Sequence, residues 1–199
     1  PDLVVMPGDF VIQDVVGGRY ITPEAIAAHL KEMRAALGVY AVLGNHDWWD
    51  DGPRIIRVFE SNGIRVLEND AARLERNGHA LWLAGLSDLW TRQPDIEGTL
   101  ARVTDDAPVI AFTHNPDLFP NVPPRVSLTL AGHTHGGQVC LPVFGRAVVP
   151  SQFGRRYAEG HVVETGRHLY VSPGVGTSIY PVRFLVPPEI TLLTLTAAP

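Results

Sequence analysis

The chain carries the stretch Gly132-His133-Thr134-His135-Gly136-Gly137 just after an apolar run at residues 126–130. A short apolar run that ends at glycine indicates a buried strand. The two histidines flank a threonine, and so their side chains share one face of an extended segment. Three other predicted strands end in polar loops of the same kind, which read Gly8-Asp9, Gly44-Asn45-His46-Asp47 and Thr113-His114-Asn115-Pro116.

These four loops are expected to meet, although they are far apart in the sequence. In open α/β sheets, binding sites lie outside the carboxyl ends of the strands, and glycine beside a ligand lets the backbone turn sharply off the strand. Each loop alone has an ordinary explanation, such as a turn aspartate or a hydrogen-bonded histidine. Their common position at strand ends, in this order, favours a shared metal site.

Outward from these loops, the first half of the chain alternates strand and helix patterns. Thr22 and Pro23 have the form of a helix start, and apolar residues then recur at helical spacing as far as Leu37. Asn77-Gly78, between two apolar-containing runs, is a strong hairpin signal. The predicted helices are 22–37, 53–61 and 95–103, and the predicted strands are 3–6, 39–43, 64–67, 72–75, 80–84, 109–112, 126–130, 169–171, 182–186 and 190–195. We therefore expect one α/β domain over residues 1–199, with parallel strands first and hairpins later.

Composition supports a folded domain and argues against one class of function. Hydrophobic residues make up 45% of the 199 residues and charged residues 19%, which is enough for a proper core. The net charge of −5 argues against a broad nucleic-acid surface. Cys140 is the only cysteine, so an intrachain disulfide is excluded. The sequence leaves open a cytoplasmic or an envelope-associated location.

The residue types in the four loops suit a hydrolytic metal centre. A carboxylate can bridge two metal ions, an amide oxygen is a neutral ligand, and imidazole nitrogens bind ions such as zinc, iron, nickel and manganese. Nitrogen and oxygen ligands without a thiolate indicate a catalytic centre rather than a structural zinc site. Such a centre lowers the pKa of a bound water, polarises a P–O bond and neutralises charge in the transition state.

The order GD, GNHD, THNPD, GHTHGG resembles the calcineurin-like metallophosphoesterases. The stretches GHTHGGQVCLP, SPGVGTSIYPVRF and PPEITLLTL are similar to a bacterial subgroup of membrane- or envelope-associated phosphodiesterases within that family. The resemblance covers essentially the whole chain. It implies an α/β sandwich with mixed sheets, and a centre of divalent Mn, Fe, Zn or Ni that holds two ions in the family.

The resemblance also implies a role for each residue that matches the family's motifs. Asp9 is the expected bridging carboxylate, and Asn45, His114 and His133 complete one metal site with it. His135 is the expected ligand of the other metal, again with Asp9. His46 binds no metal and is expected near the leaving-group oxygen, as a proton donor or hydrogen-bond donor.

Two departures from the family pattern change the expectation. The family has an Asp-x-His pair on a strand before the Gly-Asp loop, and the eight residues before Asp9 lack it. We therefore expect a truncated chain without the first strand, one firmly bound metal, and an exposed sheet edge that strand donation or dimerisation would cover. Many relatives also have an aspartate where this chain has Ile12, and Asp14 or Asp47 is the alternative partner for His46.

Other residues are weaker candidates. Asp88 follows a predicted strand and is a candidate for substrate binding, with an ordinary loop aspartate as the alternative. Arg183 is a second candidate, for a substrate phosphate. Trp48 and Trp49 are candidates for an apolar wall that would contact a lipid or a base, although packing explains at least one of them. Gly174-Val175-Gly176 is more typical of a plain turn than of a phosphate loop.

The sequence thus predicts metal-dependent hydrolysis of a phosphodiester, or of a phosphomonoester or pyrophosphate. The substrate is expected to be a small phosphorylated molecule, lipid-linked or a nucleotide. The alternative is a catalytically weak or inactive metal-binding remnant of the fold, because the Asp-x-His ligands are absent. The sequence argues against a serine hydrolase, because Gly85 and Ser87 are followed by Leu89 where the elbow motif requires glycine.

Overall fold

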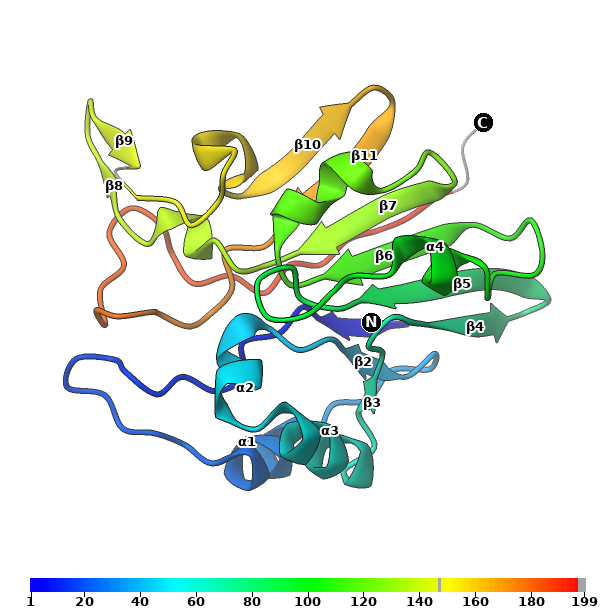
Figure 1. The fold of residues 1–199 in the computed structure, drawn as a ribbon, viewed down its shortest axis with the longest axis horizontal. Helices are drawn as coiled ribbons and strands as arrows, with labels where there is room; N and C mark the ends of the chain where they lie inside the picture. Colours follow the sequence, from blue (N-terminus) through cyan, green and yellow to red (C-terminus); the bar gives the residue numbers. More distant parts are fainter. Residues whose placement is uncertain (147, 197–199) are drawn as a thin grey trace.

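Three sheets form the framework of the protein in a computed structural model, which describes residues 1–146 and 148–196 (Figure 1). The first sheet is parallel and has the order β1 (Val4–Met6), β2 (Val39–Ala41), β3 (Arg65–Val66). The second has six strands in the order β10 (Gly160–Glu164), β11 (Arg167–Val171), β7 (Val126–Ala131), β6 (Val109–Thr113), β5 (His79–Leu86), β4 (Asp70–Arg76). The third pairs β8 (Cys140–Leu141) with β9 (Gly145–Arg146).

The second sheet is mixed, as expected for this α/β fold. Its centre, β5-β6-β7-β11, is parallel, and each end is closed by an antiparallel hairpin partner. Parallel strands here place the ends of β6 and β7 side by side, with β11 next to β7. The expected α/β sandwich with mixed sheets is therefore confirmed.

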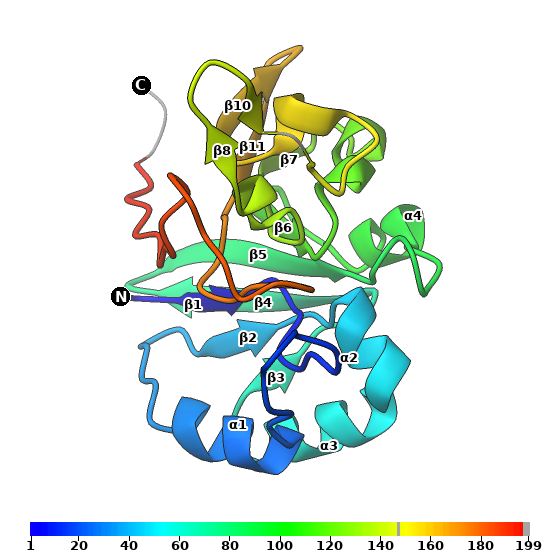
Figure 2. The same ribbon diagram turned by 90° about the vertical axis from the view of Figure 1, so that its left-hand side faces the viewer.

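The layers follow the pattern of apolar residues. Helices α1 (Pro23–Leu30) and α3 (Gly52–Ser61) cover the outer face of the first sheet (Figures 1 and 2). Ile55 and Phe59 of α3 pack there against β2. A second apolar layer, which includes Leu83 and Phe112, lies between the two large sheets. The far face of the six-stranded sheet is covered by α4 (Ile96–Leu100) and by the short 3-10 helices η1 (Pro116–Asn121) and η3 (Gly154–Tyr157).

Helix α1 begins where the sequence predicts and ends earlier. The Thr22 hydroxyl caps it by accepting a hydrogen bond from the Ala25 N–H, and Pro23 occupies the first turn. The predicted extension to Leu37 is wrong. Leu37 donates its N–H to the carbonyl of Asp2 and packs between the sheets, so its segment has to leave the helix.

The hairpin prediction is confirmed by backbone geometry. Asn77 and Gly78 both have positive φ, at 53° and 78°, which is the conformation of the tight turn that joins β4 to β5. The helix α2 (Asn45–Asp50) and the strand β10 were not predicted. Both segments are short and are stabilised by the residues that they pack against, so their own sequence does not specify them.

The two predicted C-terminal strands are wrong. Residues 182–186 form a single bridge, between Phe184 and Val139, and residues 190–195 form no strand. Their alternating apolar residues meet no neighbouring strand within the described chain, and Ile190 and Leu192 are 89% and 79% exposed. Among the described strands, β1 pairs with β2 alone and so forms one edge of its sheet.

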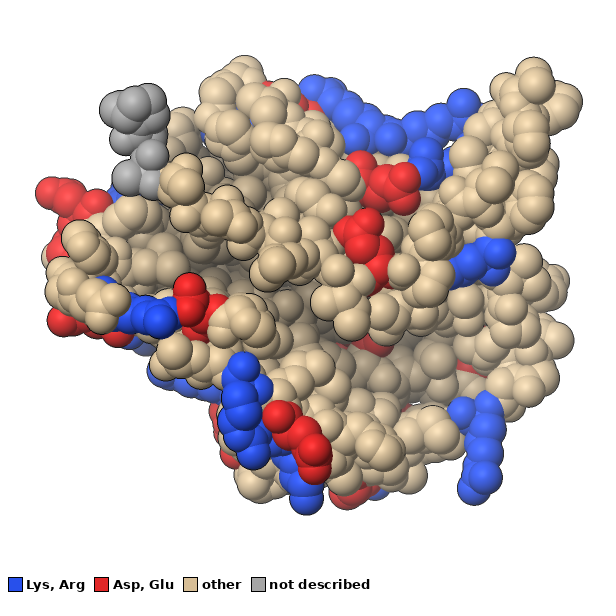
Figure 3. Space-filling view, turned by 180° about the vertical axis from the view of Figure 1, so that it is seen from behind, with Lys and Arg blue, Asp and Glu red and all other residues tan. Residues whose placement is uncertain are grey.

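The surface is mixed in charge. Seen from behind, Lys and Arg side chains lie mainly toward the edges of the molecule, and some Asp and Glu side chains lie nearer its middle, among uncharged residues (Figure 3). Within residues 1–146 and 148–196, no helix is both long enough and apolar enough to cross a bilayer.

Candidate metal centre

The four predicted loops follow strands β1, β2, β6 and β7 at their carboxyl ends. The loops after β6 and β7 are joined by a hydrogen bond from the Gly132 N–H to the His114 carbonyl, at 3.0 Å. The loops after β1 and β2 touch through glycine. A methyl group at Gly8, whose φ is +95°, would lie 2.4 Å from the backbone nitrogen of Gly44. Only glycine permits this approach, and it brings Asp9 to the end of β2.

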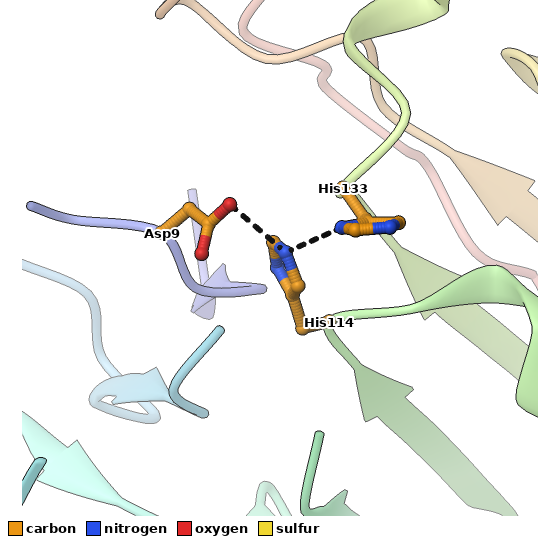
Figure 4. A group of neighbouring side chains, drawn as sticks. All are labelled: Asp9, His114 and His133. Carbon is orange, nitrogen blue, oxygen red and sulfur yellow. Dashed lines mark hydrogen bonds and ion pairs between the residues drawn. The ribbon is translucent and has the colours of Figure 1, made fainter. Parts of the chain in front are cut away.

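Asp9, His114 and His133 point toward one another from three different loops (Figure 4). Their ligand atoms all lie within 4.8 Å of one another. Nε2 of His114 is 3.1 Å from Oδ2 of Asp9 and 3.1 Å from Nδ1 of His133. Two imidazole nitrogens at this distance require a proton or a metal cation between them or beside them. Three of the predicted ligands therefore share one site.

The tautomer of His114 is set by a backbone partner. Its Nδ1 lies 2.7 Å from the carbonyl oxygen of Pro7. A carbonyl only accepts, so Nδ1 carries the hydrogen and donates it. The ring is buried, and Nε2 is left to face Asp9 and His133. An outer partner of this kind is how proteins orient histidine ligands of metals.

The electrostatics of the cluster favour a cation. Burial alone would raise the pKa of Asp9, yet the charge and hydrogen bond of His114 lower it to about 2. Burial opposes the charge on His114, but Asp9 raises the pKa of that ring to about 9. Burial and the positive charge of His114 lower the pKa of His133 to about 3. Without a metal, one proton on His114 therefore supplies the positive charge that this set of donors favours.

Two further observations fit a divalent metal. Oδ1 of Asn45 and Nε2 of His133 are buried and have no hydrogen-bond partner within residues 1–146 and 148–196. Unpaired buried polar atoms are costly, and both belong to residues that the sequence predicts as ligands. Asp9 and His133 also have positive φ, at 57° and 68°, which side-chain-bearing residues rarely adopt. The carboxylate and two imidazoles of the cluster thus suit a divalent cation. The role of Asn45 as a further ligand stays a prediction.

His135 lies outside the three-residue cluster, in the short helix η2 (His135–Gly137). Its φ is also positive, at 52°, and burial lowers the pKa of its ring. Its role as a ligand of a second metal stays a prediction.

Asp47 has a role that sequence reasoning missed. Its carboxylate is fully buried and accepts four backbone N–H groups. Oδ2 accepts from Asp9 and Gly44 at 2.8 and 2.9 Å, and Oδ1 accepts from Phe10 and Val11 at 2.8 and 3.0 Å. Burial and the charge of Asp9 raise the pKa of Asp47 to about 7, while the N–H donors favour the carboxylate. Asp47 thus fixes the Asp9 loop. The sequence feature that could have indicated this role is the position of Asp47, three residues after the helix cap Gly44.

His46 lies beside the cluster in the first turn of α2. Its backbone N–H donates to Oδ1 of Asp9 at 3.0 Å, and its ring meets Trp49 edge to face at 5.0 Å between centroids. Nδ1 of the ring is buried without a hydrogen-bond partner among the described residues. No described carboxylate therefore replaces the aspartate that many relatives have at the position of Ile12. Asp47 directs its hydrogen bonds to backbone N–H groups, and Asp14 makes none to the ring.

Asp88 is completely buried at the end of β5. Its Oδ2 accepts from the N–H groups of Trp90 and Thr91 and from the Thr91 hydroxyl, at 3.1, 2.9 and 2.7 Å. Its Oδ1 has no hydrogen-bond partner in the described part of the chain. Its negative charge also contributes to the raised pKa of His114. It holds a loop beside the site.

Arg183 has its donors occupied by backbone carbonyl groups, at 2.6–3.4 Å. The acceptors belong to His135, Pro173, Gly174, Gly176 and Val186. The guanidinium thus ties the glycine-containing turn to the loop of His135. The predicted contact of Arg183 with a substrate phosphate stays a prediction, as does that of Asp88.

Comparison with known proteins places this site in a family. The family profile described as "Calcineurin-like phosphoesterase" matches residues 1–137. The chain belongs to the calcineurin-like phosphoesterases. It is 35% identical over 198 residues to the uncharacterized metallophosphoesterase YkuE of Bacillus subtilis strain 168, covering 98% of this chain and 68% of that protein. It is 32% identical over 203 residues to phosphodiesterase YaeI of Escherichia coli strain K12, covering 98% and 70%.

A solved structure shares the fold. NAD nucleotidase (NadN) of Haemophilus influenzae superposes with a TM-score of 0.52 at 17% identity, over 86% of this chain and 40% of that one. Membership of the calcineurin-like phosphoesterases identifies this chain as a hydrolase of phosphoester bonds that uses divalent metal. The resemblance inferred from the four loops is therefore confirmed.

Proposed function

We propose that this calcineurin-like phosphoesterase hydrolyses phosphodiesters at a divalent metal held by Asp9, Asn45, His114 and His133. The observation that carries the proposal is the meeting of Asp9, His114 and His133 within 4.8 Å at the ends of three strands. When bound, such a metal lowers the pKa of water and stabilises charge on the phosphoryl oxygens. The similarity to a phosphodiesterase supports the choice of a diester.

The chain's own residues supply position and a proton. In the hydrolysis, the oxygen of water bonds to phosphorus as the water loses a proton to solvent, the ester P–O bond breaks, and the leaving oxygen takes up a proton. His46 lies beside Asp9, and its imidazole is the group that we propose gives that proton. Asp47 keeps the Asp9 loop rigid through its four hydrogen bonds. General acid catalysis of this kind contributes about 10²–10⁴-fold.

A second candidate is a metal-binding domain with weak or no turnover. It is favoured by the position of His135, which lies outside the cluster of the other ligands. A chain with only one filled site would bind one ion and lack the second charge that supports the transition state.

A hydrolysis assay separates these candidates. The chain is incubated with bis(p-nitrophenyl) phosphate and Mn²⁺, Fe²⁺, Zn²⁺ or Ni²⁺, and p-nitrophenyl phosphate tests preference for monoesters. His46→Ala should lower kcat by about 10²–10⁴-fold and leave metal affinity unchanged. Asp9→Ala should abolish metal binding and activity together. His29→Ala, an exposed histidine of α1, is the matched control. Metal binding without turnover in the parent would favour the second candidate.

A further inference from the structure

The four tryptophans of this chain divide into two pairs. Trp82 is buried in the core and donates its indole N–H to Asp105, and Trp48 packs beside α3 with the Arg92 guanidinium 4.4 Å above its ring. Trp49 and Trp90, by contrast, are 57% and 52% exposed. Packing therefore accounts for the first pair and leaves the second pair without a structural reason.

Both exposed tryptophans adjoin histidines of the proposed site. The ring of Trp49 meets His46 edge to face, with 5.0 Å between centroids. The ring of Trp90 meets His133 in the same way, with 4.4 Å between centroids. One lies beside the proposed proton donor and the other beside a proposed metal ligand. A substrate whose phosphorus sits at the cluster would have its substituents next to these two rings.

The two rings are also held on rigid supports. Trp49 lies within α2, directly after the loop that Asp47 fixes. Trp90 lies in the loop that buried Asp88 holds through the N–H groups of Trp90 and Thr91. Aromatic rings fixed in advance bind a ligand at a lower entropic cost. Such exposure of rigid apolar surface beside a polar site is typical of ligand binding.

We propose that Trp49 and Trp90 are specificity-determining residues that stack on a planar ring carried by the phosphodiester, and that the substrate class is a nucleotide diester. The inference rests on the proposed hydrolysis of diesters at this centre. A nucleobase combines a flat aromatic face with polar edges. It suits two exposed tryptophans whose rings adjoin the polar histidines of the site. A long acyl chain would require a continuous apolar channel instead.

Matched substrates test the inference. Thymidine 5′-(p-nitrophenyl) phosphate and methyl p-nitrophenyl phosphate release the same leaving group, so the ratio of their kcat/KM values reports binding of the base. Stacking of one base on one aromatic ring corresponds to about 5-fold to 150-fold. We expect the parent chain to favour the thymidine ester by at least about 10-fold. Trp49→Ala and Trp90→Ala should each reduce that ratio about 5-fold or more, chiefly through KM.

The control variants separate stacking from folding. Trp49→Phe and Trp90→Phe keep an aromatic face and should retain most of the ratio. Phe144→Ala, at a 74% exposed aromatic residue of the β8–β9 turn, should leave it unchanged. For Trp49→Ala and Trp90→Ala the readout is the ratio of the two kcat/KM values, because both rings contact site histidines. The kcat/KM for the methyl ester should stay nearly constant in Phe144→Ala. Octyl p-nitrophenyl phosphate, which carries an alkyl chain, tests whether the site prefers a lipid-like substituent to a base.

The outcomes distinguish this inference from the proposed function. Equal kcat/KM values for the thymidine and methyl esters in an active parent would overturn the inference and leave hydrolysis intact. A larger loss for the octyl ester than for the thymidine ester in the tryptophan variants would overturn it in favour of an acyl chain. If the parent hydrolyses neither ester, calorimetric binding of thymidine 5′-monophosphate decides. Binding that both Trp→Ala variants weaken supports the inference, and absent or unchanged binding overturns it.

Discussion

Asp47→Asn is the substitution that most directly tests how the centre is built. The carboxylate accepts two N–H groups on each oxygen, at 2.8–3.0 Å. Asparagine keeps one oxygen and replaces the other by an NH₂ group, which cannot accept. Two buried N–H groups then face a donor and lose their partner. An unsatisfied buried group costs about 1–3 kcal/mol, so we expect a loss of about 2–6 kcal/mol in the free energy of unfolding.

Urea denaturation of the metal-free chain measures this loss, and calorimetric titration with Mn²⁺ measures the consequence for the metal. We expect weaker metal binding, because two of the four N–H groups belong to Asp9 and Gly44. The matched control is Asp50→Asn in the same helix, where the carboxylate accepts one bond, from the hydroxyl of Tyr20 at 3.0 Å. That change should cost about 1 kcal/mol. Equal losses for Asp47→Asn and Asp50→Asn would refute this account of the loop.

Three further predictions concern the same framework. Because Asp9 raises the pKa of His114 to about 9, that ring is protonated at pH 7 without metal. Metal binding at pH 7 should then release about one proton, and fewer protons as the pH rises above 9. Calorimetric titrations in buffers of different ionisation enthalpy measure the number of protons released. Gly8→Ala should destabilise by more than about 2 kcal/mol in thermal melts, because its Cβ would meet Gly44 at 2.4 Å, whereas Gly174→Ala, at positive φ in open space, should cost about 1 kcal/mol. Arg183→Ala should lower stability by about 2–3 kcal/mol with little change in KM; a raised KM at constant stability would instead indicate a contact with substrate.

The parts of the fold that were predictable are those in which local chemistry is decisive. Asn77 and Gly78 both require positive φ in a tight turn, and these residue types adopt it at little cost. The glycines at the strand ends give the same kind of information, because few other residues allow the turn at Gly8. The four loops could therefore be placed together before their geometry was known.

The parts that were not predictable depend on partners. Residues 190–195 have the alternation of a strand, yet a strand needs a neighbour to pair with its N–H and C=O groups. Leu37 continues the helical period of α1 but belongs to another apolar layer. Trp90 showed no motif at all, and its relation to His133 follows only from the packing of two loops.

Asp47 shows most clearly what a sequence pattern leaves undecided. Its place in the Gly-Asn-His-Asp loop made it a candidate partner for the His46 ring, because a carboxylate beside a catalytic histidine is a common arrangement. The structure directs all four of its hydrogen bonds to the backbone.

Several features of the centre cost free energy when no metal is bound. Asn45 and His133 bury polar atoms without partners, and Asp9 and His133 hold positive φ, each of which costs free energy in the metal-free chain. Asp47 holds the Asp9 loop in this conformation through backbone bonds, and the Pro7 carbonyl does so for the ring of His114. These supports act on the chain itself, so the ligands are oriented before any ion arrives. A cation that took the unpaired atoms as ligands would recover their cost, so metal binding should stabilise the folded chain.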